Sequence, residues 1–219
     1  MKAKEWIDII EKGTSSHFNR LYAGDPTAGE RFVAAIRAFG EQYGEDRDIA
    51  LFSVPGRSEI AGNHTDHNGG CVLAGAIDRD VIVVAAKNED GHIRVQSEGY
   101  REILVSLSHC EDPRNFEAAC SSALVAGMVG GFLAEGYAVG GFDAYTTTRV
   151  LKGSGLSSSA AFEVAIGTVL NYFYNDGRIP NAEVAKVAQY SENVYFGKPC
   201  GLMDQMACAV GGIIAIDFA

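Results

Sequence analysis

The chain has 219 residues, of which 47% are hydrophobic and 21% are charged. This balance supports a packed core and excludes an intrinsically disordered protein. The 28 acidic residues outnumber the 18 basic ones and give a net charge of −10. We therefore expect neither a nucleic acid nor a membrane as a partner, because both ligands require a basic surface. The length fits one large domain or two small ones.

The five cysteines are odd in number and scattered, without a C-x-x-C motif. This pattern is typical of reduced thiols in a cytoplasm rather than of a disulfide framework. The first residues contain no apolar segment of the kind found in a signal peptide. The longest uncharged run, residues 118–134, is shorter than the roughly 20 apolar residues needed to span a bilayer. We expect a soluble, cytoplasmic protein.

The first quarter of the chain is predicted to be helical. Apolar residues recur at helical spacing in residues 2–12 and 30–43, and a loop rich in glycine and proline is expected at 15–29. Residues 49–54 are short, apolar and followed by Pro55 and Gly56, so they are predicted to form a strand that ends there.

The remainder is predicted to mix strands and helices. Strands are expected at 80–87, 92–97, 102–107, 141–150 and 212–218, with a turn at 88–91. Helices are expected at 116–135, 158–174 and 182–195. The two types of element do not alternate strictly, which favours an α+β fold over a doubly wound sheet.

A glycine turn joins the strand predicted at 141–150 to the helix that follows it. The turn has glycines at 153 and 155 and serines at 157–159. Glycines allow a backbone to approach an anion closely, and the N-terminus of a helix offers unpaired N–H groups and partial positive charge. These features predict phosphate binding. The alternative is an ordinary turn whose serines cap a helix.

A second polar segment runs from Pro55 to Gly70. Its Asn, His, Thr and Asp side chains supply the mixture of donors and acceptors that a polyhydroxylated ligand requires. One alternative is a solvated loop with Asx turns. Another is a zinc site formed by His64, His67 and Cys71, although no further ligands lie at a recognisable spacing.

A third segment runs from Glu192 to Gln205 and places Asp204 after a glycine loop, in apolar surroundings. A carboxylate in such a place is expected to be paired, which indicates either a function or a structural partner. The alternative is that Asp204 caps the next short helix.

Together these segments resemble the galactokinase family, within the GHMP superfamily of small-molecule kinases. The family signature G-R-x-N-x-I-G-E-H-T-D-Y-N-G-G corresponds to Gly56–Gly70. The phosphate loop G-x-G-L-S-S-S-A matches Gly153–Ala160 without a gap. The pattern E-x-x-x-x-G-x-x-C-G-x-M-D-Q matches Glu192–Gln205. Three motifs in the right order make the resemblance specific.

The resemblance implies a role for each matching position. Asp204 would be the catalytic base that takes the proton of a sugar's anomeric hydroxyl, and Arg57 would hold Asp204 charged and stabilise the transferring phosphoryl group. ATP and Mg²⁺ are the implied cofactors, and Ser159 and Glu192 would bind the metal. The sugar would contact Asn63, His64, Thr65, Asp66 and Gly201. The ATP phosphates would contact Gly153, Ser154, Gly155, Leu156, Ser157, Ser158 and Ser159.

Three positions with polar side chains depart from the family signature. Position 63 is Asn where Glu is usual, position 67 is His where Tyr is usual, and position 59 is Glu where Asn is usual. All three departures lie at the sugar end of the expected site, whereas the phosphate loop and Asp204 match. We therefore expect the general activity to follow the family and Asn63 to alter specificity or affinity for the sugar.

The resemblance also implies a fold, that of the GHMP kinase N-terminal domain (ribosomal protein S5 domain 2-like), with a mixed, mostly antiparallel sheet over residues 1–219. Family members continue into a C-terminal, ferredoxin-like domain that the chain lacks. We therefore expect the front part of a longer kinase, with that domain as its missing partner and little activity alone. The expected function is phosphorylation of galactose to galactose 1-phosphate. The alternatives are a kinase for another sugar and a non-catalytic sugar sensor.

Overall fold

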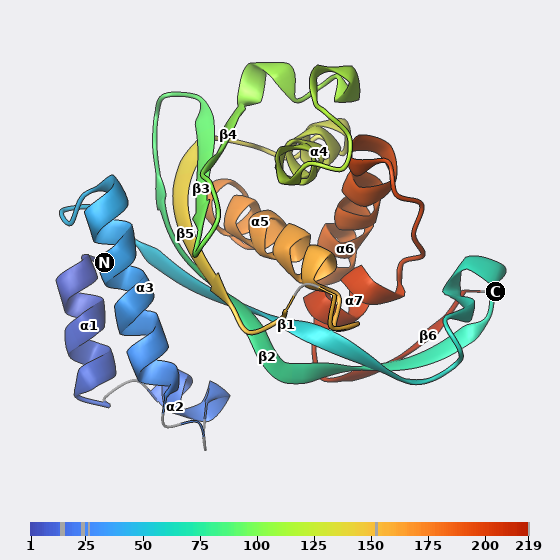
Figure 1. The fold of residues 1–219 in the computed structure, drawn as a ribbon, viewed down its shortest axis with the longest axis horizontal. Coiled ribbons are helices and arrows are strands. Elements are labelled where there is room, and N and C mark those ends of the chain that lie inside the picture. Colours follow the sequence, from blue (N-terminus) through green and yellow to red (C-terminus); the bar gives the residue numbers. More distant parts are fainter. Residues whose placement is uncertain (14–15, 23–24, 26, 152, 219) are drawn as a thin grey trace.

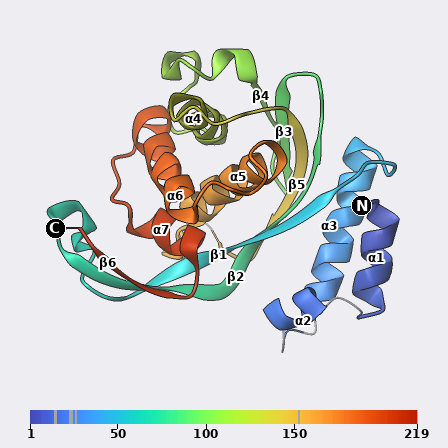
Figure 2. The same ribbon diagram turned by 180° about the vertical axis from the view of Figure 1, so that it is seen from behind.

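The computed structural model describes residues 1–13, 16–22, 25, 27–151 and 153–218. The protein has three layers, in which a curved sheet lies between a small group of N-terminal helices and a larger group of later helices (Figure 1). The view from behind shows the same separation of the two groups by the sheet (Figure 2). This arrangement is the α+β architecture expected from the sequence.

In the described part of the chain the sheet has six strands, ordered β1-β2-β5-β3-β4, and β6 pairs with β2. Neighbouring strands run antiparallel except β3 and β5, which run parallel. The mixed, mostly antiparallel sheet is therefore confirmed. The strands are β1 Ala50–Ala61, β2 Cys71–Lys87, β3 His92–Ser97, β4 Ile103–Ser106, β5 Phe142–Thr148 and β6 Ile213–Asp217.

Strand β2 supports both helix layers because its side chains alternate between the two faces of the sheet. Odd-numbered residues from Val81 to Ala85 are buried in the core beneath α4, α5 and α6. Even-numbered residues from Ile82 to Ala86 are buried in the second core, against α1 and α3. Both faces are covered, which explains the continuous apolar run in this part of the sequence.

The helices divide between the two faces of the sheet. On one face are α1 Ala3–Glu11, α2 Ser16–Leu21 and α3 Ala28–Tyr43. On the other are α4 Ser121–Ala134, α5 Ser158–Tyr174, α6 Asn181–Tyr190 and α7 Met203–Val210. No helix in the described ranges is long and apolar enough to cross a membrane.

Several expected elements have different limits in the structure. The helix expected at 116–135 begins only at Ser121, after a 3₁₀ turn at Pro113–Asn115. The helix expected at 182–195 ends at Tyr190 and continues as a π-helical turn, Ser191–Phe196. Strand β2 begins nine residues before the expected position 80, because its first part pairs with the distant strand β6.

Two expectations were wrong for identifiable physical reasons. Part of the loop expected at 15–29 is the helix α2, whose Phe18 and the following Tyr22 pack with their rings 5.1 and 5.5 Å from the ring of Phe32. Strand β1 does not end at residue 54 but continues to Ala61. The pairing of β1 with β2 shifts register just after Pro55, which accommodates a residue without an N–H donor.

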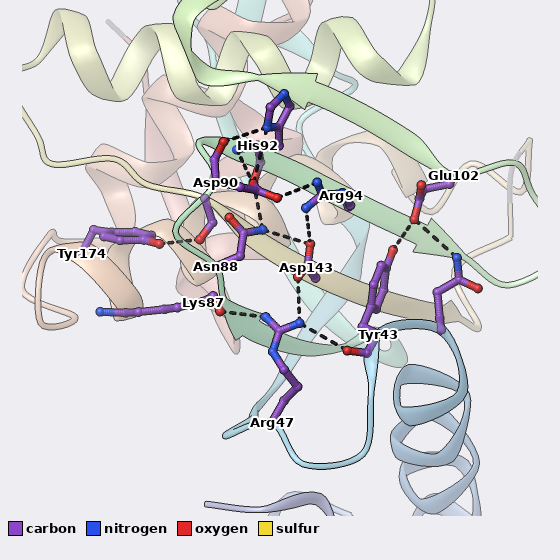
Figure 3. Close-up of polar contacts among 12 residues, drawn as sticks. Tyr43, Arg47, Lys87, Asn88, Asp90, His92, Arg94, Glu102, Asp143 and Tyr174 are labelled. Atoms are coloured by element: carbon purple, nitrogen blue, oxygen red, sulfur yellow. Dashed lines mark hydrogen bonds and ion pairs between the residues drawn. The ribbon is translucent and has the colours of Figure 1, made fainter.

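A polar cluster fixes the end of α3 to the sheet (Figure 3). Asp143 on β5 is buried and accepts from Arg47 at 2.9 Å and from Arg94 at 3.0 Å. Tyr43, at the end of α3, donates to Glu102 at 2.8 Å. These contacts join the N-terminal helices to the β3–β4 edge of the sheet.

Candidate active site

Arg57 lies at the centre of the site and joins three segments of the chain. It is buried on β1, and its Nε and Nη2 atoms each lie 2.7 Å from Oδ1 of Asp204 in the first turn of α7. Its Nη1 donates to the carbonyl of Gly155 at 2.6 Å. Its backbone N–H donates to the carbonyl of Leu156 at 3.2 Å. One side chain therefore sets the position of the glycine turn relative to Asp204.

The glycine turn between β5 and α5 is shaped to approach another group closely. Gly153 and Gly155 have φ values of +78° and +74°, in the left-handed region that favours glycine, and the space beside both is open. Ser157, also left-handed at φ +60°, donates its hydroxyl to Oδ2 of Asp204. The unpaired N–H groups of the first turn of α5 follow directly, so the turn can receive an anion beside Asp204.

Glu192 forms a second acidic centre on the π-helical turn. Its side chain is buried and gathers three donors: Ser159 at 3.2 Å, Lys198 at 2.9 Å and Gln205 at 2.8 Å. The Lys198 side chain is mostly exposed, whereas Gln205 is fully buried. Gln205 thus holds the Glu192 carboxylate from the interior, and Lys198 covers it on the side that faces the solvent.

Ser159 and Glu192 offer two oxygen ligands at the edge of the glycine turn. Among the described residues, no three His, Cys, Asp or Glu side chains gather where they could hold a metal. A cation bound here would therefore complete its coordination with water and phosphate, which is the habit of Mg²⁺. The two residues fit such an ion.

The alternative zinc site gains no support from the described side chains. His64 pairs with Glu59 at 3.2 Å, and the Cys71 thiol donates to Asp217 at 3.3 Å. The side chain of His67, the third expected ligand, lies outside the described residues.

Glu163 is a buried acid that sequence reasoning missed. It lies on α5, fully buried, and neither carboxylate oxygen has a hydrogen-bond partner among the described residues. Burial raises the pKa of Glu163 well above its usual value, and the nearby charge of Glu192 raises it further. A lone acid within the apolar run of residues 160–167 was the available signal.

The loop at residues 62–70 is held in an unusual backbone conformation. Asn63 and His64 are consecutive left-handed residues, with φ values of +53° and +50°. Glu59 on β1 accepts from the His64 backbone N–H at 2.9 Å, and its other oxygen lies 3.2 Å from Nε2 of the same residue. Thr65 donates its hydroxyl to the carbonyl of Gly62 at 2.8 Å, so that hydroxyl is engaged within the loop.

Asp66 attaches this loop to the helix that carries Asp204. Its Oδ2 accepts from the backbone N–H of Met203 at 3.2 Å. Gly201 packs directly on the carboxylate, and a Cβ added at Gly201 would overlap it. The loop, α7 and Arg57 therefore meet in one place.

The structure brings the three sequence motifs together around Arg57 and Asp204. The alternative that Asp204 caps a helix is wrong, since Leu202 is the N-cap of α7 and Asp204 lies within the first turn. Sequence reasoning missed Glu59, Lys198 and Gln205 as side chains that hold the expected site residues. Each of the three lies in the same motif as its partner, His64 or Glu192, but the spacing of the motif does not indicate these contacts.

Comparison with known proteins agrees with this geometry. The family model described as GHMP kinases N terminal domain matches residues 121–212, which include the glycine turn, Glu192 and Asp204. The model described as galactokinase galactose-binding signature matches residues 37–87, which include Arg57 and the 62–70 loop. The chain therefore carries the N-terminal domain of the GHMP kinases. Within this class, the signature that it carries is that of the galactokinases.

The chain is similar in sequence to individual galactokinases. The chain is 33% identical over 174 residues to the galactokinase of Bacillus subtilis and 34% identical over 175 residues to that of Clostridium tetani. These matches cover 79% and 80% of this chain but 44% of either relative, so the chain spans less than half their length.

Solved structures share the fold. The crystal structure of Lactococcus lactis galactokinase complexed with galactose matches with a TM-score of 0.76 and 30% identity, over 83% of this chain and 47% of that one. The mevalonate kinase of Methanococcus jannaschii matches with a TM-score of 0.64 at 18% identity, over 78% of this chain and 54% of that one. The second likeness concerns the fold alone.

Proposed function

We propose that residues 1–219 form the sugar- and phosphate-binding N-terminal domain of an ATP-dependent kinase that converts galactose to galactose 1-phosphate. The proposal rests on one observation above all: Arg57 contacts Asp204 at 2.7 Å and the glycine turn at 2.6 Å. A carboxylate, a guanidinium and a phosphate-binding turn thus share one position, as a phosphoryl transfer to a hydroxyl requires.

Asp204 is the general base in this proposal. Its side chain is 33% exposed, so a substrate hydroxyl can reach it, while Arg57 and Ser157 hold it in place. It takes the proton of the anomeric hydroxyl as that oxygen forms a bond to the γ-phosphorus of ATP, while the bond from the γ-phosphorus to the bridging oxygen breaks and ADP leaves. Arg57, adjacent to both the base and the turn, stabilises the negative charge on the transferring group.

The glycine turn binds the phosphates of ATP. The contact residues are Gly153, Ser154, Gly155, Leu156, Ser157, Ser158 and Ser159, which supply backbone N–H groups, hydroxyls and the N-terminus of α5. Ser159 and Glu192 would hold Mg²⁺, which would neutralise phosphate charge. Gln205 keeps Glu192 oriented, because it donates to the oxygen that Ser159 and Lys198 leave free.

The sugar binds between the 62–70 loop and α7. Asn63, His64 and Asp66 face it with donors and acceptors, Thr65 stabilises the loop, and Gly201 allows Asp66 to lie against α7. The departures at positions 59 and 63 from the galactokinase signature favour a second candidate, a kinase for a different hexose. A panel of hexoses in a kinase assay separates the two.

The test is Asp204→Asn in the complete protein. We expect kcat to fall by about 10²–10⁴-fold, the usual contribution of a positioned base, while galactose binding measured by calorimetry changes little. Asp112→Asn is a matched control, because Asp112 is an acid paired with Arg114 in an exposed turn. Unchanged turnover in Asp204→Asn would contradict the assigned base. Galactose binding without turnover in the unaltered protein would favour a sugar sensor.

A further inference from the structure

Two of the departures from the galactokinase signature are complementary. The signature has Asn at position 59 and Glu at position 63, whereas this chain has Glu59 and Asn63. The acid and the amide have therefore exchanged places. Both positions belong to the same short stretch, since β1 carries Glu59 into the loop that holds Asn63.

Glu59 directs its carboxylate at the loop. Its side chain is 17% exposed, and both oxygens are used by a single residue, His64. Oε1 accepts from the His64 backbone N–H at 2.9 Å, and Oε2 lies 3.2 Å from Nε2 of the imidazole. Glu59 therefore fixes the backbone of His64 and the direction of its ring together.

The backbone of the loop explains why the exchange is favourable. Asn63 and His64 both have positive φ values, +53° and +50°, a region that most side chains disfavour. Asn tolerates this region better than Glu. Two consecutive residues in this region still carry a conformational cost, and the Glu59 carboxylate supports the conformation at His64 by accepting from its backbone N–H.

The same loop is anchored at its other side by Asp66, whose carboxylate accepts from the backbone of Met203, next to Asp204. A change in the angle of the loop at His64 is thus transmitted to the space between the loop and α7. Glu59 lies on the same strand as Arg57, but both of its carboxylate oxygens are directed at His64.

We propose that Glu59 and Asn63 are an exchanged acid–amide pair, in which Glu59 is a positioning residue that sets the sugar-facing conformation of the loop through His64. Asn63 then offers the sugar an amide, which both donates and accepts, in place of a carboxylate, which only accepts. The proposal rests on the proposed function, because it assigns the pair to the binding of a hexose.

The test is a double-mutant cycle in the complete protein, with Glu59→Asn, Asn63→Glu and the double variant. Calorimetry gives the Kd for galactose. We expect each single change to raise Kd about tenfold or more: Glu59→Asn removes a carboxylate that accepts from His64, and Asn63→Glu places two carboxylates at one loop. The double variant restores the signature and is expected to return Kd to within about threefold of the starting protein. If the increases in Kd caused by the two single changes multiply in the double variant, the two residues act independently and the pairing is refuted.

Kinetics and NMR separate positioning from a general loss of structure. Because Glu59 touches no reacting atom, Glu59→Gln is expected to raise KM for the sugar with kcat within about threefold. The same variant should shift the His64 amide resonance and accelerate its hydrogen exchange, and an unchanged His64 amide would refute the proposal even if the other variants fail to fold. If the unaltered protein binds no galactose, the proposed function fails, while the His64 readout still decides whether Glu59 holds the loop.

Asp90→Asn is the matched control. Asp90 accepts from the backbone N–H of His92 at 3.1 Å and lies 3.4 Å from its ring, which repeats the Glu59–His64 arrangement at the opposite end of β2 (Figure 3). We expect no change in Kd or KM for this variant. An increase equal to that of Glu59→Gln would show that the effect is not specific to the sugar loop.

Discussion

Replacing the buried acid on α5 tests the electrostatics of the site without any ligand. Glu163 is fully buried, lacks a hydrogen-bond partner among the described residues, and has its pKa raised well above the usual 4.5 by burial and then by Glu192. The folded protein therefore retains this proton over a range of pH in which the unfolded chain has released it. The contribution of this proton to the free energy of unfolding is fully present below pH 4.5, and it is lost as the pH rises toward the pKa of the folded state.

The expected size follows from this single proton. Across the range between the two pKa values, the free energy of unfolding falls by about 1.4 kcal/mol for each pH unit. Glu163→Gln removes this loss, so the variant should match the starting protein near pH 4 and become progressively more stable above pH 5.

Chemical denaturation followed by circular dichroism between pH 4 and pH 8 measures the effect. Glu89→Gln is the control, since Glu89 is an exposed acid in the turn after β2 and its change should leave the pH dependence as it was. A difference between Glu163→Gln and the starting protein that stays constant over this pH range would refute the reasoning.

Two further outcomes are expected from packing. Gly201→Ala places a methyl group on the Asp66 carboxylate, so the loop at residues 62–70 must move away from α7. We therefore expect KM for galactose to rise at least tenfold. An unchanged KM would show that the position of the loop is not critical. At neutral pH, maleimide should label the exposed Cys71 in the folded protein but not Cys110 or Cys208. Both of these thiols are buried, and burial raises the pKa of each to about 12. Rapid labelling of either buried thiol, measured by mass spectrometry, would contradict this packing.

The elements that the sequence predicted well are those with strong local signals. Helix α5 spans Ser158–Tyr174, as expected, because a serine run precedes a long apolar stretch. Helix α2 was missed because its formation depends on ring contacts with Phe32, which lies in another helix. The length of β2 was missed because its first residues pair with β6, more than 130 residues further along.

The same division applies to the candidate site. The motifs identified Arg57, Asp204 and the glycine turn, and the structure brings them together. The residues that hold the site, such as Glu59 and Gln205, could not be found from spacing because their importance arises from contacts made only in the folded chain. The resemblance to a family signature did, however, mark Glu59 as unusual before any contact was known.

The central position of Arg57 also bears on how the chain reaches its native state. Its two side-chain partners lie 98 and 147 residues further along, so both contacts require long loops to close. Before α7 docks, a guanidinium that is 6% exposed in the finished fold lacks its carboxylate, and an isolated charge in such surroundings is strongly unfavourable. During synthesis the centre of the molecule thus remains electrostatically unbalanced until residue 204 has emerged and α7 can neutralise the charge on the first long strand.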